Sequence, residues 1–220
     1  YLITLGTTGE TPTLSKEEKK RFPPLCPDFV IELRSGTDSL EKLLSKLIEY
    51  KKDNHEIVLL DDYSDNPESL EIIQKYKEKT SFHQHKLDRN YGAHKNYGIE
   101  QCKGTWIFQL DGDEYPTDLL LENIDVVLES NVDNEVLWLP RLNYFTGVTE
   151  LDVKTWGWNY QDGMINFPDY QSRIYRNLSH IRYQRRLHEK VEGFKSYTFV
   201  PPQKDYAIVH EKTIEKQRQT

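Results

Sequence analysis

The alternation of apolar and polar positions predicts strands and helices along most of the chain. Short apolar runs rich in β-branched and aromatic residues are typical of buried strands, and apolar residues at every third or fourth position are typical of helices. Strands are predicted at 28–33, 56–62, 82–87, 105–110, 135–145 and 206–210. Helices are predicted at 39–50, 66–79, 92–102, 118–130 and in the charged segment after 210. Between about 145 and 205 we expect irregular structure.

The order of these elements predicts the fold class. Strands that alternate with helices are typical of an α/β domain with a mostly parallel sheet. The run at 56–62 is apolar on both faces, as a buried parallel strand should be. A chain of 220 residues is long enough to bury a core. We therefore expect one compact α/β domain.

Composition excludes several classes of protein. A net charge of −7 argues against a protein that coats nucleic acid, so no nucleic-acid partner is expected. No apolar run approaches the ~18 residues of a transmembrane helix, and no signal peptide is visible. Cys26 and Cys102 lie far apart without the spacing of a metal site, which is typical of reduced thiols in a cytoplasmic protein.

The segment FQLDGDEYP, residues 108–116, ends an apolar strand on three acids: Asp111, Asp113 and Glu114. Two interpretations are open. Aspartate and glycine are common in solvated turns. Buried carboxylates, however, are costly unless they are paired or bound to a metal, so the acids could instead hold a cation.

Two further strand ends carry polar residues and favour the second interpretation. Asp61 and Asp62 end the strand at 56–62, and residues 88–90 (Asp-Arg-Asn) follow the next strand. Ligands of open α/β sheets bind at the carboxyl ends of the strands. Carboxylates two residues apart can hold a hard cation such as Mg²⁺ or Mn²⁺, which then bridges phosphate oxygens. The pattern predicts a nucleotide-diphosphate site with a divalent cation.

Three longer segments carry a resemblance to a known family. They are HEIVLLDDYSDNPESLEII, DRNYGAHKNYGIEQCKGTWIFQLDGDEYP and FPDYQSRIYRN followed by LHEKVEG. Over residues 54–220 the chain resembles family-2 glycosyltransferases of the GT-A fold, of the lipopolysaccharide-core glucosyltransferase type. The resemblance implies a UDP-sugar donor, a glycan or lipid-linked acceptor, an inverting reaction and a role in cell-envelope polysaccharide synthesis. It also implies peripheral contact with the inner face of the membrane.

The resemblance assigns donor-binding and metal-binding residues. Asp61 and Asp62 would contact the uracil and the ribose. The remaining donor-site residues would be Asp88, Arg89, Asn90, Lys95, Asn96, Asp111, Arg173, Arg176 and His188. Asp111 and Asp113 would form a D-x-D motif that binds Mn²⁺ or Mg²⁺, with Glu114 beside it, and His210 would be a late metal or phosphate contact. The alternatives are that Asp61 caps the next helix, that Lys95 lies on a solvated helix face, and that His188 and His210 make ordinary polar contacts.

The resemblance also suggests the catalytic base. Asp169 falls near the position where such enzymes keep a general base, and Glu189 of the His188–Glu189 pair is the competitor. Asp169 could instead cap a short helix that carries Arg173 and Arg176. A basic group is expected to hold the diphosphate or an anionic acceptor, or to form a solvated surface: Arg173, Arg176, Arg182, Arg185, Arg186 and Lys190.

The first fifty residues resemble a second family. They look like the restriction-endonuclease-like PD-(D/E)xK proteins of cyanobacteria, with Asp28, Glu32 and Lys46 at the matching positions. Fifty residues cannot bury a separate α/β core, so we expect the nuclease half-site to be silent. The junction falls near Lys51, and the strand and helix before it are expected to complete the sheet of the domain at 51–220. RSGTD, residues 34–38, stands where the first family has residues that touch the base.

Two alternatives to a glycosyltransferase follow from this junction. One is a metal-dependent nuclease that acts through Asp28, Glu32 and Lys46. The other is a non-catalytic module that keeps the fold but has lost donor affinity. A measurement of nucleotide-sugar binding distinguishes the transferase from the nuclease and from the non-catalytic module.

Overall fold

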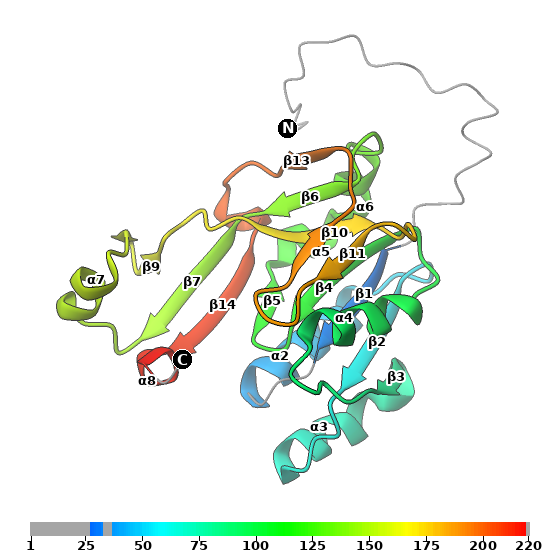
Figure 1. The fold of residues 1–220 in the computed structure, drawn as a ribbon, viewed down its shortest axis with the longest axis horizontal. Helices are drawn as coiled ribbons and strands as arrows, with labels where there is room; N and C mark the ends of the chain where they lie inside the picture. Colours follow the sequence, from blue (N-terminus) through cyan, green and yellow to red (C-terminus); the bar gives the residue numbers. More distant parts are fainter. Residues whose placement is uncertain (1–26, 33–36, 219–220) are drawn as a thin grey trace.

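The computed structural model describes residues 27–32 and 37–218, and its centre is a seven-stranded sheet (Figure 1). The strands lie in the order β13–β6–β10–β4–β1–β2–β3. Their bounds are β1 Pro27–Glu32, β2 Glu56–Asp61, β3 Ser81–Gln84, β4 Trp106–Asp111, β6 Val136–Leu139, β10 Gln171–Arg176 and β13 Tyr197–Phe199. Neighbouring strands are parallel except that β10 runs antiparallel to both β4 and β6. The predicted mostly parallel sheet is confirmed.

Strand β1, from the part of the sequence that resembles a nuclease, is a central member of this sheet. It pairs in parallel with β2 on one side and with β4 on the other. Phe29 and Ile31 of β1 are buried in the main core. The parallel pairing of the first two predicted strands is therefore confirmed.

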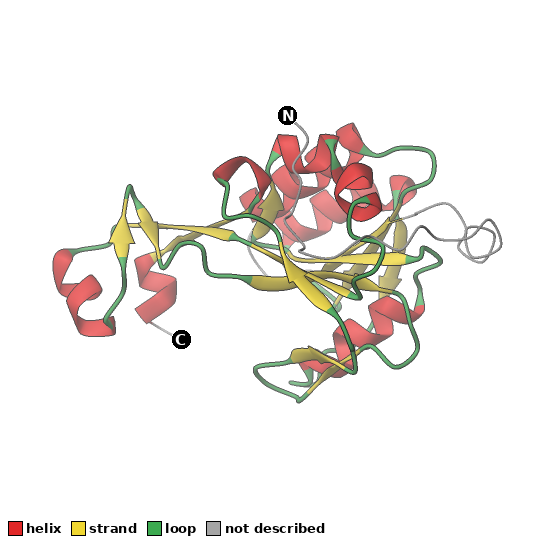
Figure 2. Ribbon diagram, turned by 90° about the horizontal axis from the view of Figure 1, so that it is seen from above, coloured by secondary structure: helices red, strands yellow, loops and turns green. Residues whose placement is uncertain are grey.

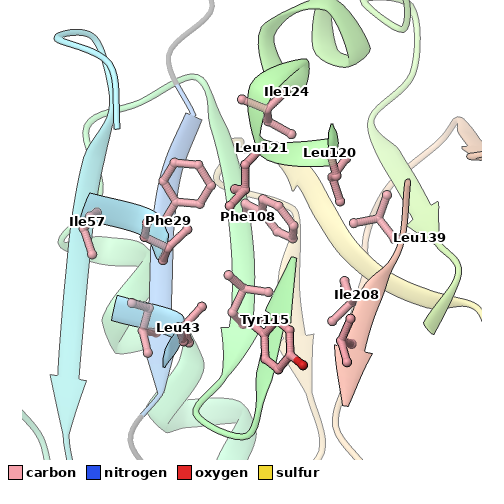
Figure 3. Packing of buried hydrophobic residues seen from close by; sticks show 14 of the residues in the cluster. Phe29, Leu43, Ile57, Phe108, Tyr115, Leu120, Leu121, Ile124, Leu139 and Ile208 are labelled. Atoms are coloured by element: carbon pink, nitrogen blue, oxygen red, sulfur yellow. The ribbon is translucent and has the colours of Figure 1, made fainter. Parts of the chain in front are cut away.

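Helices cover one face of the large sheet. They are α2 Thr37–Tyr50, α3 Pro67–Tyr76, α5 Asp118–Glu122 and α6 Ile124–Glu129, with the short 3-10 turn η1 Lys77–Lys79 after α3. The leucines whose helical spacing predicted the helix at 39–50 are all buried: Leu40, Leu43, Leu44 and Leu47. They join Phe29, Ile57 and Phe108 in one cluster (Figure 3). This packing fixes the ends of β2 and β4, which carry Asp61 and Asp111.

The opposite face is covered by α4 Tyr91–Glu100 and by a hairpin of β11 Arg182–Gln184 and β12 Lys190–Glu192. Successive side chains of a strand point to opposite faces, so Val58 and Ile107 lie on this side. They form a second buried cluster with Ile99 of α4 and Tyr183 of β11. Residues on α4 and on the hairpin are thereby brought beside β4.

A second, five-stranded sheet projects from the side of the first (Figures 1 and 2). Its order is β5–β14–β7–β9–β8. The bounds of these strands and their helices are β5 Glu114–Pro116, β7 Arg141–Thr146, β8 Tyr160–Gln161, β9 Met164–Ile165, β14 Ile208–Thr213, α7 Glu150–Trp156 and α8 Ile214–Arg218, and the 3-10 turn η2 Lys204–Tyr206 precedes β14. We refer to residues 141–165 together with 208–218 as the arm.

Two predicted elements are each divided in the structure. The strand expected at 135–145 stops at Pro140, which has no N–H for a strand ladder; β6 before it belongs to the large sheet and β7 after it to the arm. The helix expected at 118–130 is broken at Asn123 into α5 and α6.

The expectation of irregular structure after 145 is wrong, because six strands, β8 to β13, lie there.

Some expectations fall on residues that the structure does not describe. These are Cys26 and residues 34–36 of the RSGTD segment. Among the described residues, no helix is both long enough and apolar enough to cross a membrane.

Candidate active site

Polar residues singled out in the sequence gather where the strand order of the large sheet reverses. The chain runs from β1 outward through β2 and β3 and then returns to β4 on the other side of β1. Ligands of open α/β sheets bind in the crevice outside such a reversal, at the carboxyl ends of the strands. Asp111, the last residue of β4, lies opposite Glu32, the last residue of β1. The topology thus places Asp111 where a ligand is expected.

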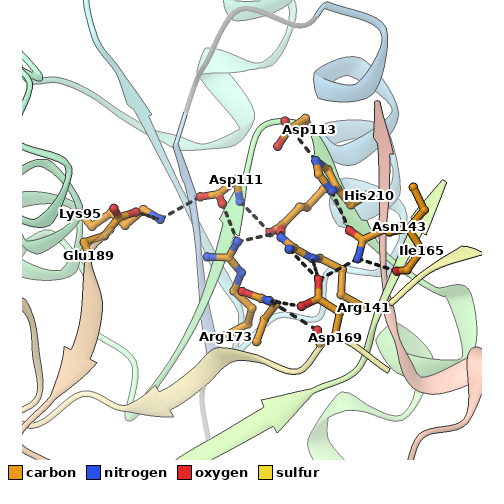
Figure 4. Close-up of polar contacts among 12 residues, drawn as sticks. Lys95, Asp111, Asp113, Arg141, Asn143, Ile165, Asp169, Arg173, Glu189 and His210 are labelled. Carbon is orange, nitrogen blue, oxygen red and sulfur yellow. Dashed lines mark hydrogen bonds and ion pairs between the residues drawn. The ribbon is translucent and has the colours of Figure 1, made fainter. Parts of the chain in front are cut away.

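Asp111 lies between two buried cations (Figure 4). Lys95 Nζ is 2.9 Å from its Oδ1, and Arg173 Nη2 is 2.5 Å from its Oδ2. Lys95, on α4, is only 2% exposed, so the alternative of a solvated helix face is wrong. Its Nζ also lies 2.9 Å from Oε1 of Glu189. Each carboxylate oxygen of Asp111 therefore contacts one cationic side chain.

Glu114, close to Asp111, forms ion pairs with two arginines. It is 1% exposed, and its Oε1 accepts from Arg141 Nη1 at 2.8 Å and from Arg173 Nη2 at 2.7 Å. Its Oε2 accepts from the Asp111 backbone N–H at 3.3 Å. Burial lowers the pKa of Arg173, but the charges of Asp111 and Glu114 outweigh burial and hold the pKa well above its ordinary value. The guanidinium groups are therefore charged and fixed in place.

Asp169 is held by donors on both carboxylate oxygens. Its Oδ2 accepts from Arg141 Nε at 3.0 Å, from Arg141 Nη2 at 2.7 Å and from Asn143 Nδ2 at 2.7 Å. Its Oδ1 accepts from Gln171 Nε2 at 3.2 Å. The alternative that Asp169 caps a helix is wrong, because Arg173 lies on strand β10. The Asp169 side chain stays 28% exposed, so it is oriented by its neighbours without being covered.

Asn143 links Asp169 to His210, and His210 in turn contacts Asp113. Its Oδ1 lies 2.9 Å from His210 Nδ1, and His210 Nε2 lies 3.5 Å from Asp113 Oδ2. Because an amide oxygen only accepts, Nδ1 is the donor. The other nitrogen can donate to Asp113 when protonated or, when deprotonated, share a cation with it. Burial raises the pKa of Asp113, but the hydrogen bond and charge of His210 outweigh burial and lower it.

Carboxylates outnumber cations in this cluster. The carboxylates are Asp111, Asp113, Glu114, Asp169 and Glu189, and the cations are Lys95, Arg141 and Arg173. Five carboxylates therefore face three permanently charged cations and His210, which leaves an excess of negative charge. Uncompensated charge in a partly buried site is unfavourable. A cation bound beside Asp113 would offset it.

The residues around Asp113 fit such a cation. The Asp113 side chain is 45% exposed, and His210 is oriented through its second nitrogen, as metal-binding histidines generally are. Across residues 27–32 and 37–218, no group of three or more His, Cys, Asp or Glu side chains could hold a metal ion. A cation here would therefore take its other ligands from phosphate and water, as Mg²⁺ usually does.

The two aspartates expected to contact the nucleoside mainly hold loops. Asp61 is fully buried; it accepts from Ser64 N–H at 3.1 Å, from the Ser64 hydroxyl at 2.6 Å and from Gln84 Nε2 at 3.0 Å. It does not cap α3, which Asn66 caps. Asp62 is half-buried and accepts from Leu87 N–H at 2.8 Å. With no exposed surface, Asp61 is not placed to contact a nucleotide in this structure.

Two loops meet at the rim of the site. Asp88 and Arg89 are exposed and have φ angles of 46° and 54°, and Asn90 caps α4 by accepting from Ala93 N–H at 3.2 Å. Arg186 Nη2 donates to the Asp88 carbonyl at 3.2 Å. His188, in the facing loop, is exposed with a φ of 52°. Left-handed backbone at non-glycine residues is strained and tends to cluster at functional sites.

The expected group of basic residues does not gather at one place. Arg176 and Asn96, both predicted to bind the donor, make their contacts outside the cluster around Asp111. Arg176 lies opposite Trp106, at the far end of β4 from Asp111, with its guanidinium 4.0 Å from the Trp106 ring centre. Asn96 exchanges two hydrogen bonds with the backbone of Tyr183, at 2.8 and 2.9 Å. Arg182 donates to two carbonyls of its own hairpin region. The prediction that Arg176 binds the donor is corrected, because Arg176 lies at the far end of β4 from Asp111. The contacts of Asn96 and Arg182 stabilise the fold.

Of the nuclease-like positions, Glu32 ends β1 opposite Asp111, whereas Asp28 lies opposite Ile107, farther from the cluster. Lys46 forms an ion pair with Asp118 of α5. Asp28 and Glu32 lie near opposite ends of β1. Arg141 and Asn143, by contrast, were missed by the sequence analysis. The available signal was their spacing of two, which places both on one face of a strand.

Comparison with known proteins identifies a family. Residues 33–192 match the sequence profile described as Glycosyl transferase family 2. That range includes Lys95, Asp111, Asp113, Arg173 and Glu189, and it ends before His210.

Individual relatives cover smaller parts of the chain. Poly(ribitol-phosphate) beta-N-acetylglucosaminyltransferase TarP of Staphylococcus aureus (strain N315) is 31% identical over 109 residues, which is 48% of this chain and 32% of TarP. A protein of Parabacteroides distasonis named 4-hydroxy-tetrahydrodipicolinate synthase is 38% identical over 86 residues, which is 35% of this chain and 28% of that protein. This second name denotes a different reaction. The likeness extends over about a third of each relative's length.

The fold has solved counterparts. The crystal structure of S. aureus TarS 1–349 in complex with UDP-GlcNAc superposes with a TM-score of 0.57 and 17% identity, over 85% of this chain and 58% of that one. At this identity the likeness concerns the fold alone. The expected GT-A-like fold is confirmed.

Proposed function

Because the chain belongs to glycosyl transferase family 2, we propose that the site at the ends of β1 and β4 binds a nucleotide-diphosphate sugar and transfers the sugar to a hydroxyl group of an acceptor. The observation that carries this proposal is the placement of Lys95 and Arg173 on either side of Asp111, at the reversal of the strand order. The donor that we propose is a UDP-sugar, because TarS, solved with UDP-GlcNAc, has this fold.

Lys95 and Arg173 are suited to the departing diphosphate. Both are buried and charged, and hydrogen bonds from charged donors to phosphate oxygens are strong. Each is already paired with a carboxylate, so neither needs to reorganise when negative charge develops on the leaving group. Such preorganised charge is the main source of rate enhancement in many enzymes.

Asp113 and His210 would hold Mn²⁺ or Mg²⁺ beside the diphosphate. Their donor types, the exposure of Asp113 and the excess negative charge of the cluster support this assignment. When bound, the ion would neutralise charge on the leaving diphosphate. Asp111, the other half of the D-x-D motif, would act by orienting Lys95 and Arg173.

Asp169 is our first choice as the general base, with Glu189 as the alternative. The acceptor hydroxyl gives its proton to the carboxylate and attacks the anomeric carbon; the new C–O bond forms as the bond to the diphosphate oxygen breaks on the opposite face, with inversion. A base must therefore lie away from the phosphate-binding cations. Glu189 pairs with Lys95, whereas Asp169 lies toward the arm, beside Asn143.

Calorimetric titration with a panel of nucleotide sugars, with and without Mn²⁺, tests the proposed function. We expect UDP-sugar binding that requires the metal. Asp113→Asn should weaken it about tenfold or more, whereas Asp133→Asn, at an exposed position beyond the opposite end of the sheet, should not. Thermal unfolding of each variant checks the fold. If Asp113→Asn binds UDP and Mn²⁺ as the parent does, the metal assignment is wrong.

A parent that binds no nucleotide sugar under any condition would overturn the donor proposal. Binding without transfer to any acceptor would instead favour the non-catalytic alternative. The acceptor that we propose is a glycan or a lipid-linked glycan, in keeping with the resemblance to enzymes of cell-envelope polysaccharides. TarP, by its name, acts on poly(ribitol-phosphate).

A further inference from the structure

Two tryptophans pack against each other in the arm and are partly open to solvent. The ring centres of Trp156 and Trp158 are 4.4 Å apart, with 37° between the ring planes. Trp156 is 38% exposed. Tryptophan normally buries a large apolar area in the core, and exposed apolar surface on a soluble protein often marks a binding site.

The sequence builds this pair through the end of helix α7. Residues two apart in a helix do not face each other, so a continued helix would keep the rings separate. Gly157 instead adopts a left-handed φ of 62°, and Trp158 N–H donates to the Val153 carbonyl at 3.0 Å. This closing turn, which favours glycine, folds Trp158 back onto Trp156.

The helix that carries the pair is itself held firmly. Thr149 and Asp152 form a reciprocal capping box at its start. Asp152 is also bound by Arg218 of α8, whose Nη2 lies 2.8 Å from both carboxylate oxygens. The rings are therefore presented in a fixed position rather than on a loose segment.

A path of aromatic rings connects the pair to the candidate active site. Trp158 packs edge-on against Phe145 with ring centres 5.5 Å apart, and Phe145 packs edge-on against His210 at 5.8 Å. His210 Nε2 lies 3.5 Å from Asp113. Each step is shorter than 6 Å, so the pair is joined to the candidate active site by a short series of direct contacts.

The charge around the pair offers no attraction to an anionic occupant. The acids Glu150, Asp152 and Asp162 are balanced by Lys154, by Arg218, which pairs with Asp152, and by Lys204, which pairs with Asp162. Without an excess of positive charge, this surface would not attract a phosphate polymer or an anionic membrane surface. One face of a pyranose ring, by contrast, is lined by C–H groups, which suit the electron-rich face of an indole ring.

We propose that Trp156 and Trp158 form a platform that binds an uncharged pyranose unit of the acceptor glycan. The proposal rests on the proposed transfer function, because it assigns the platform to the acceptor. It names a substrate class, a neutral pyranose-containing glycan, that differs from the poly(ribitol-phosphate) in the name of TarP.

The test is an array of neutral pyranose oligosaccharides, followed by titration of the best binder monitored at the indole N–H signals in NMR spectra. We expect binding by the parent, and dissociation constants raised about three- to tenfold in Trp156→Ala and in Trp158→Ala. Trp156→Phe should retain most of the affinity. Tyr197→Ala is the matched control, because Tyr197 is an aromatic residue 55% exposed on β13, outside the arm.

Parallel titration with UDP and Mn²⁺ separates the two proposals. If the parent fails to bind UDP while glycan binding depends on Trp156, the donor proposal fails and the platform stands. If no neutral oligosaccharide binds, or binding is unchanged in Trp156→Ala and Trp158→Ala, the platform is refuted. It is also refuted if a ribitol-phosphate oligomer or vesicles containing phosphatidylglycerol bind in its place.

Discussion

Arg141 contacts Glu114 on one side and Asp169 on the other, and so joins the acids of the D-x-D region to the candidate base. The same hydrogen-bonded series continues in both directions. In order it runs through Asp113, His210, Asn143, Asp169, Arg141, Glu114, Arg173 and Asp111. Each side chain is oriented by its neighbours, so a substitution within the series should act first on geometry. Conservative, isosteric changes are therefore the informative ones.

The two candidate bases can be separated by isosteric amides. Asp169→Asn and Glu189→Gln keep the shape of each side chain but cannot take a proton. We expect Asp169→Asn to lower kcat by about a hundredfold or more while UDP-sugar binding by calorimetry is kept. Glu189→Gln should act mainly on donor affinity, through Lys95. Full turnover in Asp169→Asn together with lost turnover in Glu189→Gln would transfer the role to the glutamate.

Some of these residues could be predicted from sequence because their role is local. Asp111 and Asp113 follow a strand directly, and the end of a strand is visible in the apolar pattern. The network around Asp169 could not be predicted. Its partners Arg141 and Asn143 lie more than twenty residues away, on a strand whose position depends on a change of sheet at Pro140.

At the scale of elements, His55 joins the segment before β2 to helix α6. It is 4% exposed, and its Nε2 lies 2.9 Å from Asp125 Oδ1. Burial lowers the pKa of His55, and the hydrogen bond and charge of Asp125 offset this only in part. The folded protein thus favours the neutral ring more than the unfolded chain does.

This pKa shift gives stability a pH dependence of known sign. A lowered folded pKa means that the contribution of His55 is fully present above the unfolded pKa of about 6.5. It is lost as the pH falls from there through the folded value. Urea unfolding between pH 7.5 and 5 should show a falling free energy of unfolding, with a smaller fall in His55→Gln. His180→Gln, at a side chain 48% exposed, is the control, and equal pH profiles for all three proteins would contradict the assignment.

Helices with one buried apolar stripe and strands buried on both faces could be predicted from the sequence. Helix α2 shows leucines at helical spacing, and β2 is an unbroken apolar run. The strands between 160 and 199 are two to six residues long and carry few apolar residues in sequence. Such strands are defined by their partners in the sheet, and a single sequence does not show those partners.

At the scale of the whole molecule, we propose that the segment before Lys51 and the rest of the described chain form one cooperative domain. Leu43 of α2 is fully buried in the main core with residues of β2 and β4. Leu43→Ala should lower the free energy of unfolding by about 2–5 kcal/mol, with a single transition by circular dichroism and by tryptophan fluorescence. Leu70→Ala, at a residue 47% exposed, should change it by about 0.5 kcal/mol or less. Two separate transitions would show that the segment folds as its own unit.

A single residue, Pro140, lies between β6 of the large sheet and β7 of the arm. Because Arg141 and Asn143 belong to the arm and both bind Asp169, a tilt of the arm would displace these contacts of the candidate active site. An acceptor that shifts the arm would change how tightly the donor is held. Thermodynamic linkage then requires the donor to change acceptor affinity by the same factor. Donor and acceptor occupancy would be cooperative, and comparing the UDP-sugar dissociation constant with and without saturating acceptor would measure the coupling.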